Sequence, residues 1–428
     1  MDKRTFIKNL IGFLGLAVSP FSLFSHEKQN DEFGFSLQEK EKWYADIWDK
    51  IRKDYLLNPD IINLESGYYC MLPQPILENY LENIRRVNYL HTYYKRKLMA
   101  DDRKKIMQKL SDFLECPTEE IIVTRNATES IDTILSGIDW KPGDEILYAI
   151  QEYPAMIAMI QQLSRRYKIQ PIEISIPFQP SSDEEILNLY RSKINNKTRL
   201  ILASHIINIT GHVLPIKKLC QMAHEHKVEV LVDGAHAIGH LDFKIKDLEC
   251  DYYASSLHKW LSVPLGAGLL YVQSKHIPKI WPLLGDNEYP NHDIRKLNHT
   301  GTQPFAVQLT IPFAIDYLQQ IGLKNKENRL KALKQHWYKK LWDLKNPNLV
   351  FFSPIEESRS CGIGTIGIKN IKATDLADKL FNEYKIWTVG IDFARVNGVR
   401  VTPNVYNTFE EVESLAHAIV QIAQNVKD

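Results

Sequence analysis

Apolar positions follow two different periods along the chain between about residue 72 and residue 318. Apolar side chains three and four residues apart, as in Arg103–Leu114, favour amphipathic helices, whereas short apolar runs such as Glu229–Val232 favour buried strands. The predicted strands are Glu120–Thr124, Glu145–Ile150, Ile172–Ile176, Arg199–His205, Glu229–Val232, Tyr252–Ser255 and Gly268–Val272. The predicted helices are Arg103–Leu114, one that opens at Asn126, Tyr153–Arg166, Asp183–Ile194 and Leu214–His226. This alternation is typical of a doubly wound α/β domain.

A second alternation follows two longer helical stretches, Pro304–Ile321 and Lys324–Leu344. The charges at 324–334 predict a solvated face for the second of these helices. The later predicted elements are strands at Leu349–Phe352, Ile363–Ile368, Trp387–Gly390 and Val399–Val401, and helices at Ala373–Glu383 and Thr408–Val426. The predicted organisation is an α/β protein with a large domain at 73–318, a small C-terminal α/β domain at 319–428, and a segment at 28–72 that packs on the small domain.

The N-terminus has the pattern of an export signal. Three basic residues within Met1–Lys8 precede an apolar stretch at Leu10–Phe24, and a polar stretch follows. The apolar stretch is shorter than the ~20 residues that span a bilayer, and its length is typical of a signal peptide. The string KRTFIK resembles a twin-arginine signal with lysine in the first arginine position. We expect a signal peptide at 1–27 and an exported, periplasmic protein; an uncleaved membrane anchor and a cytoplasmic protein are the alternatives.

Composition and charge narrow the classes of partner. The chain is 44% hydrophobic and 25% charged, which is ordinary for a globular protein. Its net charge of +1 gives no electrostatic reason to expect nucleic acid or a membrane surface as partner. The five cysteines are odd in number and lack CxxC spacing, so we expect buried thiols rather than disulfides. No histidine pair has a third ligand at suitable spacing, so no metal site is predicted.

Asp233 and Lys259 predict the chemistry of the site. Asp233 ends an apolar strand and Lys259 follows the next one, and ligands bind at the carboxyl ends of parallel strands. Desolvation disfavours the charged form of a lysine, so the neutral amine becomes available for a Schiff base with an aldehyde. A neighbouring aspartate would keep a pyridine nitrogen protonated and make the ring an electron sink. The pair therefore predicts pyridoxal phosphate as cofactor.

Other residues nearby suit the phosphate and the ring of this cofactor. Ser256 and His258 flank Lys259 and offer hydrogen-bond donors. The helix that opens at 126–128 offers free backbone N–H groups and a hydroxyl to an anion. Tyr153 follows a predicted strand end, where its ring can stack on the ring of the cofactor.

The stretches VDGAHAIGH and SSLHKWLSVPLGAGLLYV resemble the class V aminotransferase family of fold-type I pyridoxal-phosphate enzymes. The resemblance runs in order along nearly all of residues 60–425, and the RNATES and EYP stretches look most like the isopenicillin N epimerase-like branch. It implies a fold-type I transferase with a large mixed-sheet domain and a small C-terminal domain, pyridoxal 5′-phosphate as cofactor, and a homodimer.

The resemblance also implies a role for individual residues. Lys259 would carry the cofactor as a Schiff base and move the proton at the substrate α-carbon, while Asp233 would bind the pyridine nitrogen. Arg400 would bind the substrate carboxylate in a bidentate fork. The implied cofactor contacts are Ala127, Thr128, Ser256 and His258 at the phosphate, Tyr153 on the ring face, Asn208 and His236 near the ring hydroxyl, and Thr302 at the phosphate of a neighbouring subunit.

Two departures separate the chain from the cysteine desulfurases of this family. They have a histidine at the stacking position and a catalytic cysteine shortly before the arginine, whereas this chain has Tyr153 and no cysteine between Trp387 and Arg400. We therefore expect an aminotransferase or epimerase-like enzyme acting on an amino acid or amine, and not a cysteine desulfurase. A C–S or other β-lyase of the same family, and a catalytically idle exported binding protein, are the alternatives.

Overall fold

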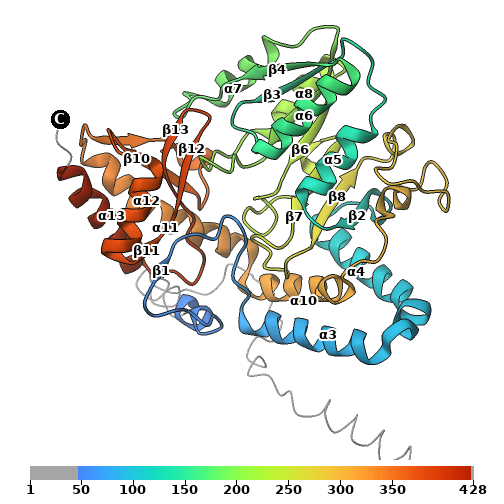
Figure 1. The fold of residues 1–428 in the computed structure, drawn as a ribbon, viewed down its shortest axis with the longest axis horizontal. Coiled ribbons are helices and arrows are strands. Elements are labelled where there is room, and N and C mark those ends of the chain that lie inside the picture. Colours follow the sequence, from blue (N-terminus) through green and yellow to red (C-terminus); the bar gives the residue numbers. More distant parts are fainter. Residues whose placement is uncertain (1–46, 426–428) are drawn as a thin grey trace, which may run out of the picture. The chain divides into compact units, whose positions relative to one another are not determined.

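The computed structural model of the protein describes residues 47–425. Its largest sheet has seven strands in the order β2-β8-β7-β6-β5-β3-β4 (Figure 1). The strands from β7 to β4 are parallel, whereas β8 is antiparallel to both of its neighbours, so the sheet is mixed, as predicted. The strands are β2 Ile121–Thr124, β3 Glu145–Ala149, β4 Gln170–Ile174, β5 Thr198–Ser204, β6 Glu229–Asp233, β7 Tyr252–Ser256 and β8 Gly268–Val272.

Helices surround this sheet, and α5 and α6 share a core with one of its faces. Ile134 of α5 and Ile160 of α6 are fully buried in the same apolar cluster as Leu202 and Leu231 of the sheet. The whole of Val230–Asp233 is buried, so both faces of β6 are covered. The helices of this part are α3 Gln74–Tyr93, a π-helical turn at Tyr94–Leu98, α4 Met99–Leu114, α5 Ala127–Gly137, α6 Pro154–Tyr167, α7 Asp183–Arg191, α8 Ile216–Glu225, α9 Ile245–Leu248 and α10 Phe305–Ile321.

A second sheet, with four antiparallel strands in the order β12-β13-β10-β9, lies in the C-terminal part of the chain (Figure 1). Its core joins fully buried side chains of α11 and α13 to the strands, including Trp337, Val399 and Ile419. Strands β1 and β11 form a separate two-stranded parallel sheet. The elements are β1 Ile62–Asn63, α11 Leu323–Asp343, β9 Leu349–Phe351, β10 Gly364–Ile368, α12 Ala373–Tyr384, β11 Ile386–Trp387, β12 Val389–Phe393, β13 Val396–Val401 and α13 Phe409–Gln424.

The observed elements follow most of the predicted ones, and the differences include the following three. The strand predicted at Ile172–Ile176 begins two residues earlier, as β4. The strand predicted at Trp387–Gly390 is wrong as a single element, because β11 pairs with β1 whereas β12 pairs with β13. Helix α3 was not predicted; in it only Ile76 and Asn83 are buried, so the apolar periodicity that marks a helix is weak.

The predicted solvated face at 324–334 is a further error. Lys326 and Lys334 of α11 are only 4% and 0% exposed. Lys326 Nζ donates to the carbonyl of Trp260, and Lys334 Nζ donates to the Pro354 carbonyl at 2.8 Å and to Ser360 Oγ at 2.7 Å. Long side chains can bury their stems while the ammonium binds backbone oxygens, so charge in the sequence did not reveal exposure.

The predicted signal peptide at 1–27 lies outside the described residues, as does 28–46 of the segment predicted to pack on the small domain. The domain boundary predicted at 318/319 stays a prediction.

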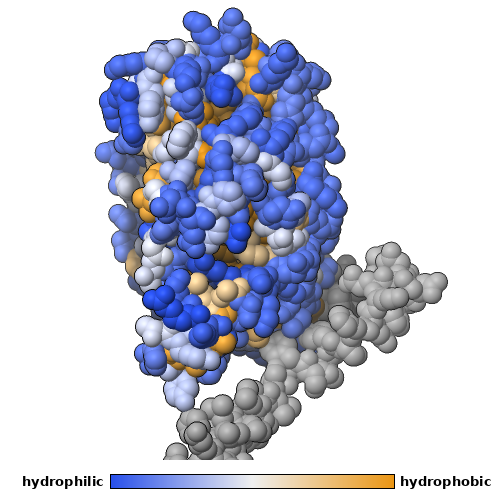
Figure 2. Space-filling model, turned by 90° about the vertical axis from the view of Figure 1, so that its right-hand side faces the viewer, coloured by the Kyte–Doolittle hydropathy of each residue, from blue (hydrophilic) through white to orange (hydrophobic). Residues whose placement is uncertain are grey.

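Between residues 47 and 425 no helix has the length and apolar character needed to cross a bilayer. Figure 2 shows a mainly hydrophilic face with small apolar patches. The most exposed large apolar side chains of the loop 273–303 are Trp281, Leu283 and Leu284.

Candidate active site

The carboxyl ends of β5, β6 and β7 lie next to one another and place Asp233 in the sheet between two partners. Asp233 pairs in register with Ser204 of β5 and with Ala254 of β7. Its side chain is buried, and Oδ1 accepts the backbone N–H of Ala235 at 2.9 Å. Burial raises the pKa of the Asp233 carboxyl, while that hydrogen bond and the nearby charge of Lys259 act in the opposite direction. Asp233 is therefore a buried acid whose ionised form is favoured by the charge of Lys259.

Lys259 lies in the turn that follows β7 and directs its amine toward His236. The Nζ atom of Lys259 is 2.9 Å from Nε2 of His236. Desolvation lowers the pKa of Lys259 to about 8, although the Asp233 carboxylate favours the charged form. A lysine with this pKa is partly neutral near physiological pH, which is the form that can attack an aldehyde or accept a proton.

The tautomer of His236 follows from its neighbour Trp260. The indole Nε1–H of Trp260 donates to Nδ1 of His236 at 3.2 Å. Burial lowers the pKa of His236 well below its usual range, so the ring is neutral. An indole nitrogen can only donate, so the proton of the neutral His236 ring lies on Nε2. His236 therefore donates to the Lys259 amine and favours its neutral form.

Replacing Trp260 with phenylalanine is expected to raise the pKa of Lys259. Without the indole donor, the His236 proton is free to move to Nδ1, and the neutral amine then loses its partner. A hydrogen bond worth about 1 kcal/mol corresponds to a shift of up to about one pH unit. The measurement is the pH dependence of the rate at which cofactor-free protein reacts with pyridoxal phosphate; the midpoint should move upward. Trp337→Phe is the control, because its buried indole N–H has no hydrogen-bond partner among residues 47–425.

The start of helix α5 and the residues before Lys259 form one hydrogen-bonded group. Asn126 caps the helix by accepting the backbone N–H of Glu129 at 2.8 Å. The backbone N–H of Ala127 donates to Ser256 Oγ at 3.0 Å, which joins the helix start to the end of β7. His258 donates from Nδ1 to the Ala267 carbonyl at 3.0 Å, so its Nε2 remains for another contact. A helix N-terminus with adjacent hydroxyl and imidazole groups suits a phosphate.

Gly268 allows this helix start to approach the sheet. A Cβ atom at residue 268 would lie 2.6 Å from the backbone N and Cα of Asn126. Gly268→Ala is therefore expected to displace the start of α5 and to weaken cofactor binding by about tenfold or more, measured by titrating cofactor-free protein. Gly285→Ala is the matched control, because no atom of the described part of the chain lies within 4 Å of a Cβ there. Equal affinities of the two variants would contradict the proposed phosphate position.

Asn208 and Arg400 come together on the side of the small sheet. The NH1 group of Arg400 donates to the backbone carbonyl of Asn208 at 3.3 Å. Asn208 Oδ1 is buried and has no hydrogen-bond partner within residues 47–425. Tyr153 precedes α6 and is 42% exposed, and Thr302 is exposed in the loop before α10. The structure thus joins Lys259 to His236, Ala127 to Ser256 and Arg400 to Asn208. Tyr153 and Thr302 are exposed, and Thr128 is half-buried in the first turn of α5.

Two acidic residues of this region, Glu152 and Glu65, were not predicted from the sequence as part of the site. Glu152 is fully buried and accepts the backbone N–H and the hydroxyl of Ser204 at 3.0 and 2.5 Å. Burial, with a smaller contribution from Asp233, raises the pKa of Glu152 to about 8. Glu65 pairs with Arg400 at 2.8 Å. The strand-end rule that indicated Asp233 also applies to Glu152, which follows β3, whereas no local pattern indicates Glu65.

Comparison with known proteins identifies the family. The family model described as aminotransferase class-V matches residues 71–415. The chain belongs to the class V aminotransferase family. This class V protein is 27% identical over 399 residues to the isopenicillin N epimerase of Amycolatopsis lactamdurans, with 89% of this chain and 100% of that protein covered. A probable cysteine desulfurase of Pyrococcus abyssi is 24% identical over 405 residues, covering 89% of this chain and 99% of that protein.

The fold agrees with this assignment. The apo structure of a cysteine desulfurase from Thermococcus onnurineus NA1 matches with a TM-score of 0.78 at 20% identity, over 88% of this chain and 98% of that chain. At this identity the match shows the fold alone, which is that of fold-type I. The structure and the family together therefore confirm the predicted fold class.

Pyridoxal phosphate is the cofactor of this class V protein, and the residues present fit it. The unpartnered Asn208 Oδ1 is the kind of buried polar atom that a ring hydroxyl satisfies. The start of α5 and Ser256 would hold the phosphate, Asp233 the ring nitrogen, and Lys259 the aldehyde carbon. Within the described residues no group of three or more potential ligands could hold a metal ion.

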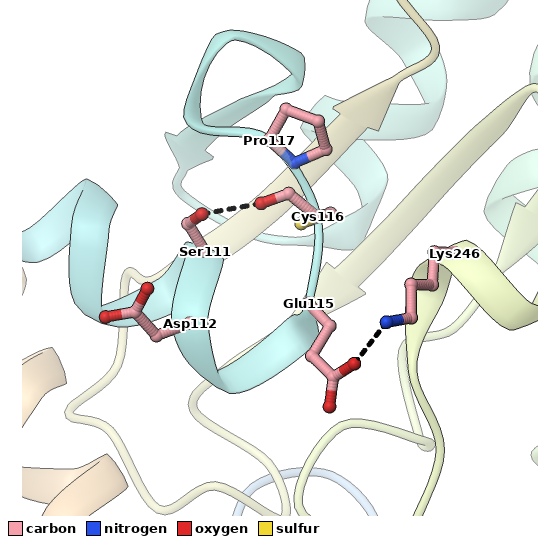
Figure 3. A pocket seen from close by; sticks show the side chains of 6 residues that line it. All are labelled: Ser111, Asp112, Glu115, Cys116, Pro117 and Lys246. Atoms are coloured by element: carbon pink, nitrogen blue, oxygen red, sulfur yellow. Dashed lines mark hydrogen bonds and ion pairs between the residues drawn. The ribbon is translucent and has the colours of Figure 1, made fainter.

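A surface depression elsewhere on the molecule has a different character. It has a volume of about 470 Å³ and lies beside the C-terminal end of α4 (Figure 3). Its walls are Ser111, Asp112, Glu115, Cys116, Pro117 and Lys246. Figure 3 shows Lys246 paired with Glu115 and the hydroxyl of Ser111 bonded to the Cys116 carbonyl. None of the predicted cofactor or substrate residues lines it, so it is separate from the active site.

Proposed function

We propose that the protein is a pyridoxal-phosphate enzyme that removes the α-proton of an amino acid and acts as an aminotransferase or an epimerase-like enzyme. The observation that carries this proposal is the Lys259 amine, held 2.9 Å from His236, with burial lowering its pKa to about 8 beside the Asp233 carboxylate. When bound, the cofactor supplies an electron sink for the charge left at the substrate α-carbon. Lys259 is then the base and acid that moves the proton.

The surrounding residues support this proton transfer. The Asp233 carboxylate would hold the ring nitrogen of the cofactor and stabilise a positive charge on it. The His236 Nε2–H favours the neutral form of the Lys259 amine. Arg400, buried at 7% exposure, supplies the cation for a substrate carboxylate. Each residue thus holds a charge or a proton at a defined atom.

The cysteines argue for a branch other than the sulfur-relay desulfurases. All five cysteines of the chain are buried. Burial raises the pKa of Cys70 and of Cys361 to about 12, and the pKa values of the other three thiols are raised as well. The thiolate is the nucleophile in persulfide formation, so a buried thiol with a raised pKa is poorly suited to it. Some relatives in the same family are named as cysteine desulfurases. The buried thiols of this chain are the reason for proposing a different reaction here.

The products of the reaction distinguish an epimerase from an aminotransferase and a β-lyase. The purified protein would be mixed with single L- and D-amino acids in deuterated water, and substrates and products analysed by NMR. We expect deuterium at the α-carbon of one amino acid, with the opposite enantiomer for epimerisation or a keto acid for transamination. Release of the β-substituent would assign a β-lyase. Absence of exchange with every amino acid would contradict the proposal and favour a binding protein.

We also propose that two copies of the chain form a homodimer in which Thr302 reaches the partner's cofactor phosphate. Thr302 is exposed, and the preceding part of its loop exposes 70% of Trp281. Apolar surface of this kind is common where two copies meet. Mixing inactive Lys259→Ala and inactive Thr302→Ala subunits should restore part of the activity, because half of the mixed sites carry neither change. No recovery in proven mixed dimers would contradict a role for Thr302 across subunits.

Export is a further proposal, and it rests on the sequence of residues 1–27 alone. A protein that binds its cofactor covalently in a folded cleft must fold before transport if the cofactor is loaded in the cytoplasm. A twin-arginine route transports folded proteins and is compatible with this order. Cell fractionation with N-terminal sequencing tests it; a cytosolic protein with an intact N-terminus would contradict export.

A further inference from the structure

Arg400 does not present a free guanidinium, because Glu65 already pairs with it. The NH2 group of Arg400 lies 2.8 Å from Glu65 Oε1, and the two side chains are only 8% and 10% exposed. Glu65 Oε1 also accepts the backbone N–H of Tyr68 at 2.9 Å, and Oε2 accepts the hydroxyl of Thr402 at 3.1 Å. Glu65 therefore supplies the counter-charge that a buried guanidinium requires.

The remaining atoms of Arg400 are also closely surrounded. NH1 donates to the Asn208 carbonyl, and Nε is buried without a hydrogen-bond partner in the described part of the chain. A Cβ atom at Gly67 would lie 2.7 Å from NH2, so the backbone next to Glu65 lies directly against the guanidinium. Among the described residues, NH1 and NH2 of this guanidinium each have an acceptor and Nε has none.

The backbone around Glu65 is held at both ends. The N–H of Leu64 donates to the Trp387 carbonyl at 3.0 Å, and the N–H of Ser66 donates to the Thr402 carbonyl at 3.1 Å. The N–H of Cys70 donates to the carbonyl of His258, next to Lys259, at 3.3 Å. These bonds fix the segment between the small sheet and the Lys259 loop, so Glu65 can leave Arg400 only by turning its side chain.

A substrate carboxylate at Arg400 would create an excess negative charge. Two carboxylates would then share one guanidinium in a site that is largely shielded from water, where like charges repel strongly. The substrate carboxylate must therefore compete with Glu65 for the N–H groups of Arg400. An amine without a carboxylate meets no such competition.

We propose that Glu65 is a specificity-determining residue, which competes with the substrate carboxylate for Arg400 and so weakens the binding of amino acids relative to the corresponding amines. The proposal rests on the proposed function, because it takes Arg400 as the carboxylate site. It assigns to the segment before α3 a direct part in substrate choice.

The first test compares L-alanine with ethylamine, which differ only in the carboxylate. Binding to the holoenzyme is followed by the change in visible absorption, for the wild-type protein and Glu65→Gln. Glutamine keeps the size and an acceptor oxygen but removes the charge, so L-alanine should bind at least about tenfold more tightly and ethylamine unchanged within about twofold. Equal changes for both ligands, or weaker binding of L-alanine, would overturn the proposal.

A matched control uses a second ion pair, outside the site. Arg52 and Glu411 lie 2.7 Å apart, with side chains 33% and 19% exposed. Glu411→Gln is expected to lower thermal stability, because glutamine has one acceptor oxygen, whereas Glu411 accepts from Arg52 at Oε1 and from the Thr408 N–H at Oε2. It should leave the ratio of the L-alanine and ethylamine affinities unchanged, so a change in that ratio in Glu65→Gln does not arise from general destabilisation.

The second test needs neither cofactor nor amine. In cofactor-free Glu65→Ala, the Arg400 guanidinium lacks its counter-charge, and acetate should replace the missing carboxylate. Acetate should raise the unfolding midpoint of this variant by about 3 °C more than that of the wild type, whereas acetamide should not. Equal effects of acetate on both proteins would overturn the proposal. If neither L-alanine nor ethylamine changes the visible absorption in the first test, the proposed function has failed. The acetate experiment still decides the role of Glu65 in that case.

Discussion

Replacing Lys259 with alanine is expected to lower turnover by at least about 10³-fold and to remove the visible absorption of the covalently held cofactor. In the proposed function Lys259 supplies both the attachment and the proton transfer, whereas the nearby amine of Lys326 binds the carbonyl of Trp260. The neighbouring His236 has a pKa well below its usual range, since burial disfavours its charged form, so it is a poor substitute base. Steady-state turnover and an absorption spectrum of the purified variant check this.

Lys334→Met is the matched control for this variant. Lys334 is also fully buried, and burial lowers its pKa to about 7, but its Nζ donates to Pro354 and Ser360 in the C-terminal part. The control should keep the absorption and most of the turnover while its unfolding midpoint falls. An active, coloured Lys259→Ala protein would show that another residue holds the cofactor.

Replacing Asp233 with asparagine should lower turnover by about 10²–10³-fold while the cofactor stays attached to Lys259. Asparagine has nearly the same shape and can still accept the Ala235 N–H that Asp233 Oδ1 accepts at 2.9 Å. It lacks the negative charge that would stabilise a protonated ring nitrogen. Turnover, absorption and the unfolding midpoint of the same preparation separate a loss of chemistry from a loss of folding.

Asp251 provides the control for Asp233, because it is equally buried at the opposite end of the parallel strands, directly before β7. Burial by itself would raise its pKa, but hydrogen bonds from His276 and His224 hold the pKa at about 2. The stabilisation is complete above pH 4 and is lost as the pH falls toward 2. Asp251→Asn should therefore be less stable at pH 7, with a smaller difference below pH 4, and should keep its turnover. A loss as large as that of Asp233→Asn would contradict a specific role for Asp233.

Asp233 and Lys259 could be predicted at the site from the positions at which parallel strands end. Parallel strands end at a common edge, so Asp233 after β6 and Lys259 after β7 were expected in one crevice, and the charge of Lys259 does act on the Asp233 carboxyl. The start of α5 was predicted from Asn126, which is a preferred capping residue. Short-range patterns of this kind depend on a few neighbouring positions, and a sequence displays them directly.

Contacts between distant segments could not be predicted in the same way. Glu65 and Arg400 are 335 positions apart, and no sequence motif includes both residues. The hydrogen bond from Trp260 to His236 depends on how the chain turns after Lys259, where Ser262 has a positive φ of 57°. Lysine is usually a surface residue, and the partners that bury Lys334, the Pro354 carbonyl and the Ser360 hydroxyl, are 20 and 26 positions away, so no local pattern indicates them.

The attachment point of the cofactor is the most direct test of the whole account. The holoenzyme would be reduced with borohydride, which makes the bond between lysine and cofactor permanent, then digested, and the modified peptide sequenced by mass spectrometry. We expect the cofactor on Lys259, in the peptide that joins β7 to β8. A cofactor on Lys296, Lys326 or Lys334, the other buried lysines of lowered pKa, or no modified peptide at all, would contradict this prediction.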